Sequence, residues 1–198
     1  MKAILPSILV FSFSLWGAEQ KVVNFEDLQT QGKIGSQLYY LFNQDTPFTG
    51  KAVGFKYING QKKFEHNYKD GKLSLDIGWY KSGQKKSEEN YKDGKPHGLW
   101  TDWYENGQKR SEGKYKNGVI GLPNKGHHGL WTWWYESGQK MKEENWKDGK
   151  LMSTEAWKPN GEKCPVTNVK DGDGVGVRYN EDGTEKARYT YKDGELVD

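Results

Sequence analysis

Short aromatic segments alternate with polar segments along most of the chain, and glycine-containing turns separate them. In one unit, the aromatic and β-branched segment 99–104 is followed by Asn106-Gly107, a polar segment 109–115 and a second turn, Asn117-Gly118. Asn-Gly favours a tight hairpin turn because both residues tolerate positive φ. The pattern therefore predicts a β-hairpin whose second turn leads into the next hairpin.

The turn glycines recur at a fixed spacing. Six units each contain two glycines 11 residues apart, the first at positions 60, 83, 107, 138, 161 and 183. Successive units are 22 to 31 residues apart. A unit of this length cannot bury a hydrophobic face alone, so neighbouring units must stack. We predict an all-β fold, an elongated and twisted antiparallel sheet of about six stacked β-hairpin repeats with an N-terminal cap.

Two positions of the repeat are aromatic in five of the six units. Eight residues after the first glycine stand Tyr68, Tyr91, Tyr115, Trp146, Val169 and Tyr191. Four residues before it stand Lys56, Trp79, Trp103, Trp134, Trp157 and Tyr179. Stacked hairpins place equal positions in rows across the strands, where cross-strand aromatic pairs stabilise by about 0.2–1 kcal/mol each. We expect these two rows to hold the array together.

The repeats leave two segments at the N-terminus. Residues 1–18 contain Lys2, the apolar stretch 4–16 and the small residues Gly17 and Ala18, which predict a secretory signal peptide and export to the periplasm, cell envelope or extracellular space. The alternative is an uncleaved membrane tether. Residues 19–49 lie outside the repeat register and are expected to cap the first hairpin. The repeat domain is then 50–198, with an inserted loop at 119–127 and a divergent, capping C-terminal end.

Composition and charge narrow the range of partners. The net charge is only +3, and Lys and Glu are interleaved, which argues against nucleic-acid binding and gives little electrostatic support for membrane contact. Nine Trp and twelve Tyr can supply the buried area that a core needs. Cys164 is the only cysteine, so no intramolecular disulfide can form.

The polar residues show no catalytic or metal-binding pattern. His97 and His128 both precede Gly-Leu-Trp, so the repeat itself accounts for them. One glutamate position also recurs, and we expect it to form solvated pairs with lysines, because acid/base catalysis needs a cleft that shifts pKa values. These glutamates are Glu65, Glu88, Glu112 and Glu143. We predict a non-enzymatic protein with no cofactor and no bound metal.

The densest aromatic cluster is the candidate partner-binding site. It comprises Trp131, Trp133 and Tyr135, together with Trp100 and Tyr104 at matching places in the preceding repeat. Alternation along a strand puts Trp131 and Trp133 on one face of the sheet. An exposed aromatic patch often marks a binding site. The alternative is that stacking between repeats buries both faces.

Three segments resemble the bacterial MORN-variant repeat (membrane occupation and recognition nexus). They are Tyr-Lys-Asp-Gly-Lys-Pro-His-Gly-Leu-Trp at 91–100, Trp-Tyr-Glu-Asn-Gly-Gln-Lys at 103–109, and the copy at 129–150. The resemblance extends over about residues 38–196. It implies a chain of β-hairpins, a role in protein or membrane contact, and no catalytic residues. Family members of the YwqK type are catalogued as antitoxins of toxin–antitoxin systems.

The leading hypothesis is an exported, non-enzymatic scaffold that binds a protein partner. A cell-wall or glycan-binding module is one alternative, because aromatic hairpins can stack against sugars. An antitoxin-like inhibitor of a toxin protein is the other.

Overall fold

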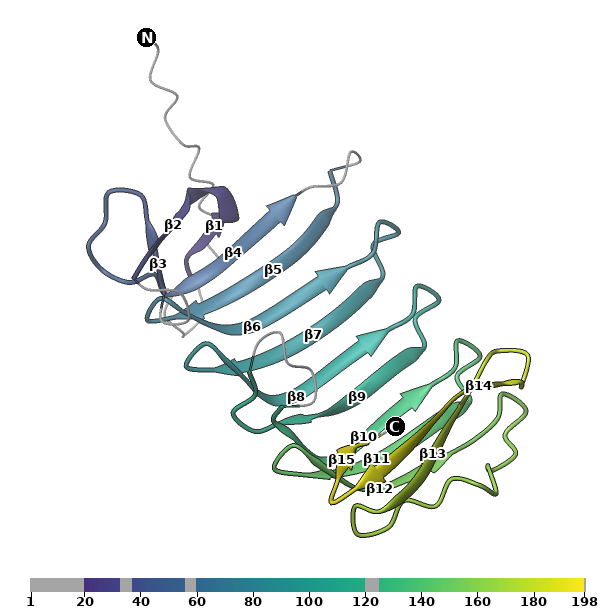
Figure 1. The fold of residues 1–198 in the computed structure, drawn as a ribbon. Coiled ribbons are helices and arrows are strands. Elements are labelled where there is room, and N and C mark those ends of the chain that lie inside the picture. The colour runs from purple at the N-terminus through teal and green to yellow at the C-terminus, as the bar shows by residue number, and fades with distance from the viewer. Residues whose placement is uncertain (1–19, 33–36, 56–59, 120–124, 198) are drawn as a thin grey trace.

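The structure of the chain is a computed structural model that describes residues 20–32, 37–55, 60–119 and 125–197 (Figure 1). The predicted signal peptide at 1–18 and most of the predicted insert at 119–127 lie outside these residues.

A ten-stranded sheet forms the body of the molecule, in the order β1-β4-β5-β6-β7-β8-β9-β10-β11-β12. β1 pairs with β4 in parallel, and the following strands pair antiparallel with their neighbours in sequence. The result is the elongated, twisted meander of Figure 1, which confirms the predicted fold class. The strands are β1 (Val22–Asn24), β4 (Gly50–Phe55), β5 (Lys62–Lys69), β6 (Lys72–Trp79), β7 (Lys85–Lys92), β8 (Lys95–Trp103), β9 (Lys109–Tyr115), β10 (His127–Trp134), β11 (Lys140–Lys147) and β12 (Lys150–Ala156).

The Lys-Asp-Gly turns have the backbone geometry that the sequence predicts. Between β7 and β8, Asp93 has φ 53° and Gly94 has φ 74°. Two consecutive residues of positive φ match the twist of the flanking strands in a two-residue hairpin. The local sequence therefore sets the hairpin length and, through it, the strand register.

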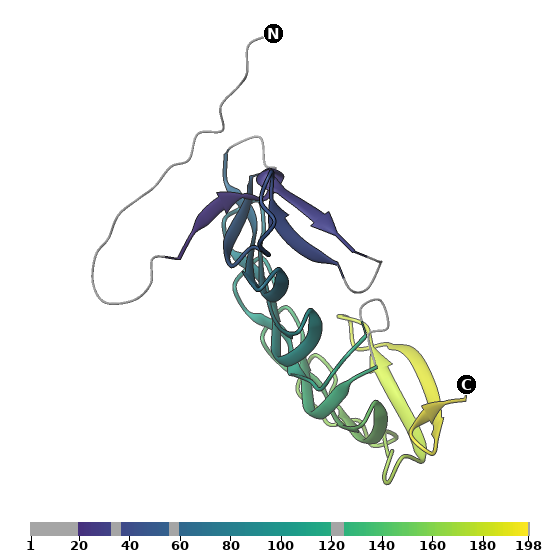
Figure 2. The same ribbon diagram turned by 90° about the vertical axis from the view of Figure 1, so that its left-hand side faces the viewer.

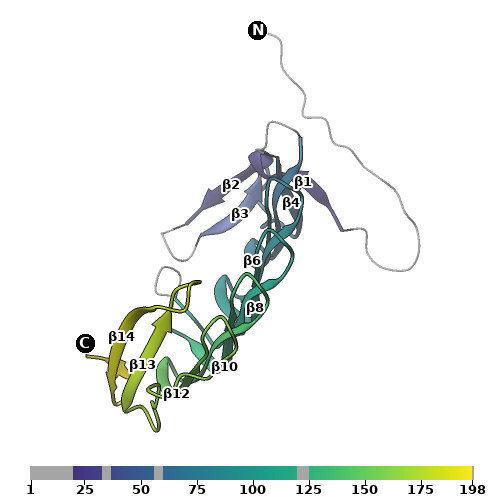
Figure 3. The same ribbon diagram turned by 90° about the vertical axis from the view of Figure 1, so that its right-hand side faces the viewer.

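The last hairpin does not extend the long sheet. β13 (Gly174–Tyr179), β14 (Glu185–Lys192) and β15 (Glu195–Leu196) form a separate three-stranded sheet that folds back beside β10–β12 (Figures 1 and 3). Backbone hydrogen bonds from Leu151 to Gly194 and from Gly172 to Met152, both 3.0 Å, join the two sheets. This differs from one continuous array of six hairpins, although the divergence of the final repeats signalled a change.

The N-terminal segment packs across the start of the long sheet. It contains the 3₁₀ turn η1 (Phe25–Asp27) and the hairpin of β2 (Leu28–Gln31) and β3 (Leu38–Leu41). Phe25 and Tyr39 pack into a cluster around the buried Phe48 and Tyr68. Figures 2 and 3 show this hairpin and the C-terminal sheet on the same side of the long sheet, at its two ends.

The two faces of the long sheet therefore differ. We call the side that these two units pack against the covered face, and the opposite side the open face. The covered face contains the main core, in which Tyr115, Trp131, Trp146, Leu151 and Val169 are buried. The open face contains Trp103 and Trp134, which are partly exposed.

Candidate functional site

The middle of the covered face presents Trp100, one of the predicted binding residues. Strands β6 and β8 lie between the N-terminal hairpin and the C-terminal sheet in Figure 3. Trp100 is on β8 and is half-buried. Its ring packs between Tyr91 and Tyr115, with centroid distances of 5.3 and 4.5 Å, and its Nε1 donates to the Asn90 carbonyl at 2.8 Å. The ring is held in one orientation while part of it remains exposed.

Trp131 is only 5% exposed and belongs to the core. It stacks on His127 at 4.0 Å and on Trp133 at 5.6 Å. The ring also lies over Gly113, where a Cβ atom would be 2.0 Å from it. The prediction that Trp131 contacts a partner is therefore corrected, because neighbouring rings and the core cluster that includes Leu151 and Val169 bury it.

Tyr104 and Tyr135 connect successive repeats rather than facing a partner. Each hydroxyl donates at 2.8 Å to a backbone carbonyl of the next repeat, that of Trp134 and that of Trp157 respectively. Tyr135 is 0% exposed, whereas Tyr104 is half-buried. Tyr135 is thus removed from the candidate surface, and Tyr104 has a structural hydrogen bond of its own.

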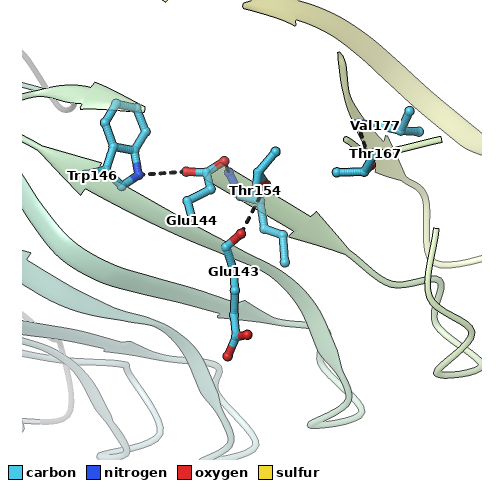
Figure 4. Close-up of polar contacts among 7 residues, drawn as sticks. Glu143, Glu144, Trp146, Thr154, Thr167 and Val177 are labelled. Carbon is cyan, nitrogen blue, oxygen red and sulfur yellow. Dashed lines mark hydrogen bonds and ion pairs between the residues drawn. The ribbon is translucent and has the colours of Figure 1, made fainter. Parts of the chain in front are cut away.

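Trp133 is half-buried and packs against the core cluster of the covered face. The Lys142 ammonium sits 3.9 Å from the centre of its ring and donates to Glu144 at 2.6 Å. Figure 4 shows Glu144 also accepting from Trp146 Nε1, at 3.1 Å. This network satisfies a carboxylate that is only 6% exposed, and it fixes the position of Trp133.

Three carboxylates lie beside Trp100 on the covered face, and we call them the acidic surface: Asp76, Glu89 and Asp102. Asp76 on β6 is directly opposite Glu89 on β7, and Glu89 is opposite Trp100 on β8. The side chains of Asp76 and Asp102 are 28% and 32% exposed. Burial raises the pKa of Glu89, and the charges of Asp76 and Asp102 add to the rise, although a hydrogen bond from Tyr91 opposes it.

Few cations offset these carboxylates. His66 Nε2 is 3.3 Å from Asp76, and Arg110 Nη2 is 3.3 Å from Asp102. Glu89 accepts from the Tyr91 hydroxyl at 2.8 Å and forms no ion pair within 4 Å among the described residues, although the charge of His66 acts to lower its pKa. The sequence analysis missed the acidic surface because it followed the glutamate that recurs in each repeat. Strand alternation along β7, which separates Glu88 from Glu89, could have revealed it.

The recurring glutamates lie on the open face in a regular ladder. Each forms an ion pair with the lysine three residues earlier, and that lysine also lies over a tryptophan of the next repeat. The Lys–Glu pairs are Lys62–Glu65, Lys85–Glu88 and Lys140–Glu143 at 2.7 Å and Lys109–Glu112 at 2.5 Å. The Lys–Trp pairs are Lys62–Trp79, Lys85–Trp103, Lys109–Trp134 and Lys140–Trp157, at 4.2 to 5.9 Å. The predicted pairing with lysines is confirmed, but Glu65 is buried, at 6% exposure, and not solvated as predicted.

Two further reactive side chains, His127 and Cys164, are enclosed. Burial, with a contribution from Lys142, lowers the pKa of His127 to about 4, so this histidine is neutral at physiological pH. Cys164 is 2% exposed and accepts a hydrogen bond from the Tyr179 hydroxyl at 2.9 Å. Within the described ranges, no three His, Cys, Asp or Glu side chains gather as ligands for a metal ion. No helix in those ranges has the length and apolar character required to span a membrane.

Comparison with known proteins identifies the repeat. The family model described as the MORN repeat variant matches residues 77–93, 96–117 and 128–148, which run from β6 to the end of β11. No curated protein matches the chain. Among solved structures, the chain is similar to one in the crystal structure of accessory secretory protein 1,2 and 3 in Streptococcus pneumoniae, with 12% identity and a TM-score of 0.28. That alignment covers 66% of this chain and 22% of the other.

Proposed function

We propose that this chain, which carries three MORN-variant repeats, is a non-enzymatic scaffold that binds a protein partner through the middle of the covered face. One observation carries the proposal. Both ends of this face are covered by other parts of the chain, whereas β6–β8 between them keep a half-exposed Trp100 beside partly exposed carboxylates. Fixed aromatic side chains are the residues that most often dominate binding energy at protein interfaces.

The geometry of the surface favours binding over catalysis. Its carboxylates lie on a twisted sheet face, and general acid/base catalysis needs groups within hydrogen-bond reach of a positioned substrate. The rigid hairpin stack presents a surface whose shape changes little on binding, which reduces the entropic cost of association. We also propose export, on the basis of the apolar segment near the N-terminus. Fractionation of a tagged chain tests that part separately.

A matched pair of tryptophan variants tests the scaffold. Trp100 and Trp103 are on the same strand, both half-buried, and point to the covered and open faces respectively. The tagged chain, captured from cell-envelope extract, should recover a reproducible partner, and Trp100→Ala should reduce recovery while Trp103→Ala retains it. Circular dichroism and urea unfolding establish that both variants are folded. Equal recovery by both variants, or no reproducible partner, would contradict the proposal.

Glycan binding and toxin inhibition, the two narrower functions, can be distinguished with the same tagged chain and variants. A ring beside carboxylates also suits a sugar, so a glycan-binding module would sediment with purified cell wall in a Trp100-dependent manner. An antitoxin-like inhibitor of the YwqK type would instead protect cells from the toxicity of the captured partner. Each function would use the same face, and only the identity of the partner would change.

A further inference from the structure

The acidic surface includes an arrangement that costs folding energy. Asp76 and Glu89 occupy directly opposite positions on β6 and β7, where like charges destabilise a sheet. Asp102 shares the same face, two residues from Trp100. The neighbouring charge and partial burial both raise the pKa of Glu89, which is the direction expected when the ionised form is disfavoured.

On the open face of the same strands, a carboxylate is neutralised by a lysine. Glu88, adjacent to Glu89 but on the open face, has Lys85 at 2.7 Å. Among the described residues, Glu89 has the Tyr91 hydroxyl and the more distant charge of His66, and Asp76 has that histidine in place of a lysine. On these neighbouring strands, the carboxylates without a lysine partner are therefore those of the covered face.

We propose that this surface binds a basic, extended segment of the partner protein, with lysine or arginine side chains on Asp76, Glu89 and Asp102. The inference rests on the proposed scaffold function and specifies the chemistry of its partner. Charge complementarity selects this occupant, because added cations relieve the repulsion between Asp76 and Glu89. Arginine suits the site particularly, since its guanidinium can bridge two carboxylates or lie against an aromatic ring.

The spacing of the surface fits such a segment. Neighbouring strands are about 4.8 Å apart, so Asp76 and Glu89 can share one cation or take two adjacent ones. Side chains on one side of an extended peptide repeat about every 6.6–6.8 Å. Lysine and arginine side chains are long and flexible, so a peptide with a basic residue at every second position can reach the three carboxylates although its repeat exceeds the strand spacing. Trp100 is directly opposite Glu89 in the sheet, so its partly exposed ring can contact one of these cations.

The test uses the full chain and a labelled peptide of alternating arginine and serine, eight residues long, in fluorescence anisotropy at low salt. Glu89→Gln and Glu88→Gln remove the same charge from adjacent residues on opposite faces. Glu89→Gln should weaken binding by about fivefold or more, while Glu88→Gln should change it by less than about twofold. A glutamate–serine peptide serves as the control and should not bind. Equal losses in the two variants, or equal binding of the acidic peptide, would overturn the proposal.

Stability provides a second, independent readout. Glu89→Gln should raise the urea midpoint, because it relieves repulsion and a glutamine oxygen can still accept from Tyr91. A purely structural carboxylate would give the opposite sign, so a lower midpoint would contradict the inference. A concentration-dependent dimer that Glu89→Gln abolishes would assign the surface to a second copy and also overturn it. If the basic peptide does not bind but Trp100-dependent capture of a partner persists, this inference fails and the scaffold function stands.

Discussion

The hydroxyl of Tyr104 donates a hydrogen bond to the backbone carbonyl of Trp134, 30 residues further along the chain, at 2.8 Å. Equivalent bonds join Tyr80 to Trp103 and Tyr135 to Trp157. Each tyrosine lies at the base of one turn, and each acceptor is at the same place in the next repeat. The turns along this edge of the sheet are therefore linked by side chains as well as by the strand ladder.

We predict that Tyr135→Phe lowers the free energy of unfolding by about 1 kcal/mol. Tyr135 is 0% exposed, so loss of its hydroxyl leaves the Trp157 carbonyl without that donor in an enclosed site. Tyr104→Phe removes the same bond at a half-buried position and should cost less, because water can replace the donor. Urea unfolding of both variants measures the difference, and equal effects would argue against burial as its cause.

We predict that Glu65 stabilises the fold in a pH-dependent way. Burial acts to raise the pKa of Glu65, but hydrogen bonds and charge from Lys51 and Lys62 outweigh it and lower the pKa. A lowered pKa means that this stabilisation is present above the unfolded pKa of about 4.5 and is lost as pH falls through the folded value.

Glu65→Gln should therefore cost about 1–2 kcal/mol at pH 7 and little at pH 3. Glu88→Gln is the matched control, because it holds the same repeat position with a side chain that is 38% exposed instead of 8%. Its cost at pH 7 should be below about 0.5 kcal/mol. Urea unfolding of both variants at the two pH values measures these costs. A loss for Glu65→Gln that does not depend on pH would count against the ion pairs as its cause.

The repeat period and turn chemistry were sufficient to predict the hairpins, because each hairpin is determined locally. Asp93-Gly94 adopts the predicted turn. Tyr115 and Trp146, which occupy one of the two recurring aromatic positions, are in the core as expected. Lys-Asp-Gly turns specify the strand lengths without information from distant residues. The prediction was therefore accurate for the part of the fold that neighbouring repeats build together.

Contacts between distant segments could not be predicted in the same way. Alternation places Trp131 and Trp133 on one face, but it does not reveal that Trp131 is buried in the core cluster while Trp133 stays half-buried at its margin. The side chain at the linking position changes where the array ends. Lys158 replaces the tyrosine that links successive turns and forms an ion pair with Glu162 instead, at 3.0 Å. The Lys158 ammonium also lies 6.0 Å from the centre of the Tyr179 ring in β13, so the next hairpin meets this position through a cation–π contact in place of the tyrosine hydrogen bond.

We predict that Gly113→Ala destabilises the protein by about 1–3 kcal/mol through overpacking. The added Cβ would be 2.0 Å from the Trp131 ring, and this ring cannot move far because it stacks on His127. Gly176→Ala is the control, since its Cβ would have 3.4 Å to the nearest atom. Thermal unfolding compares the two, and a mild effect of Gly113→Ala would show that the ring adjusts.

We predict that His127 makes the protein less stable in mild acid. Burial, followed by the charge of Lys142, lowers its pKa from 6.5 to about 4. The unfolded chain therefore takes up a proton below pH 6.5 that the folded chain accepts only near pH 4. Stability should fall across this window by about 1.4 kcal/mol per pH unit.

His127→Phe isolates this contribution, because phenylalanine can keep the stack on Trp131 without a titrating group. It loses the contact between His127 Nε2 and the Tyr115 hydroxyl, 3.1 Å, so its stability at pH 7 should be somewhat lower. Its decline between pH 6.5 and 4 should nevertheless be shallower than that of the wild type. His128→Gln, at a neighbouring side chain that is 43% exposed, should keep the wild-type decline. Urea unfolding as a function of pH, with a nuclear magnetic resonance titration of the imidazole protons, measures both effects, and a His127 pKa near 6.5 would contradict the enclosed, neutral state.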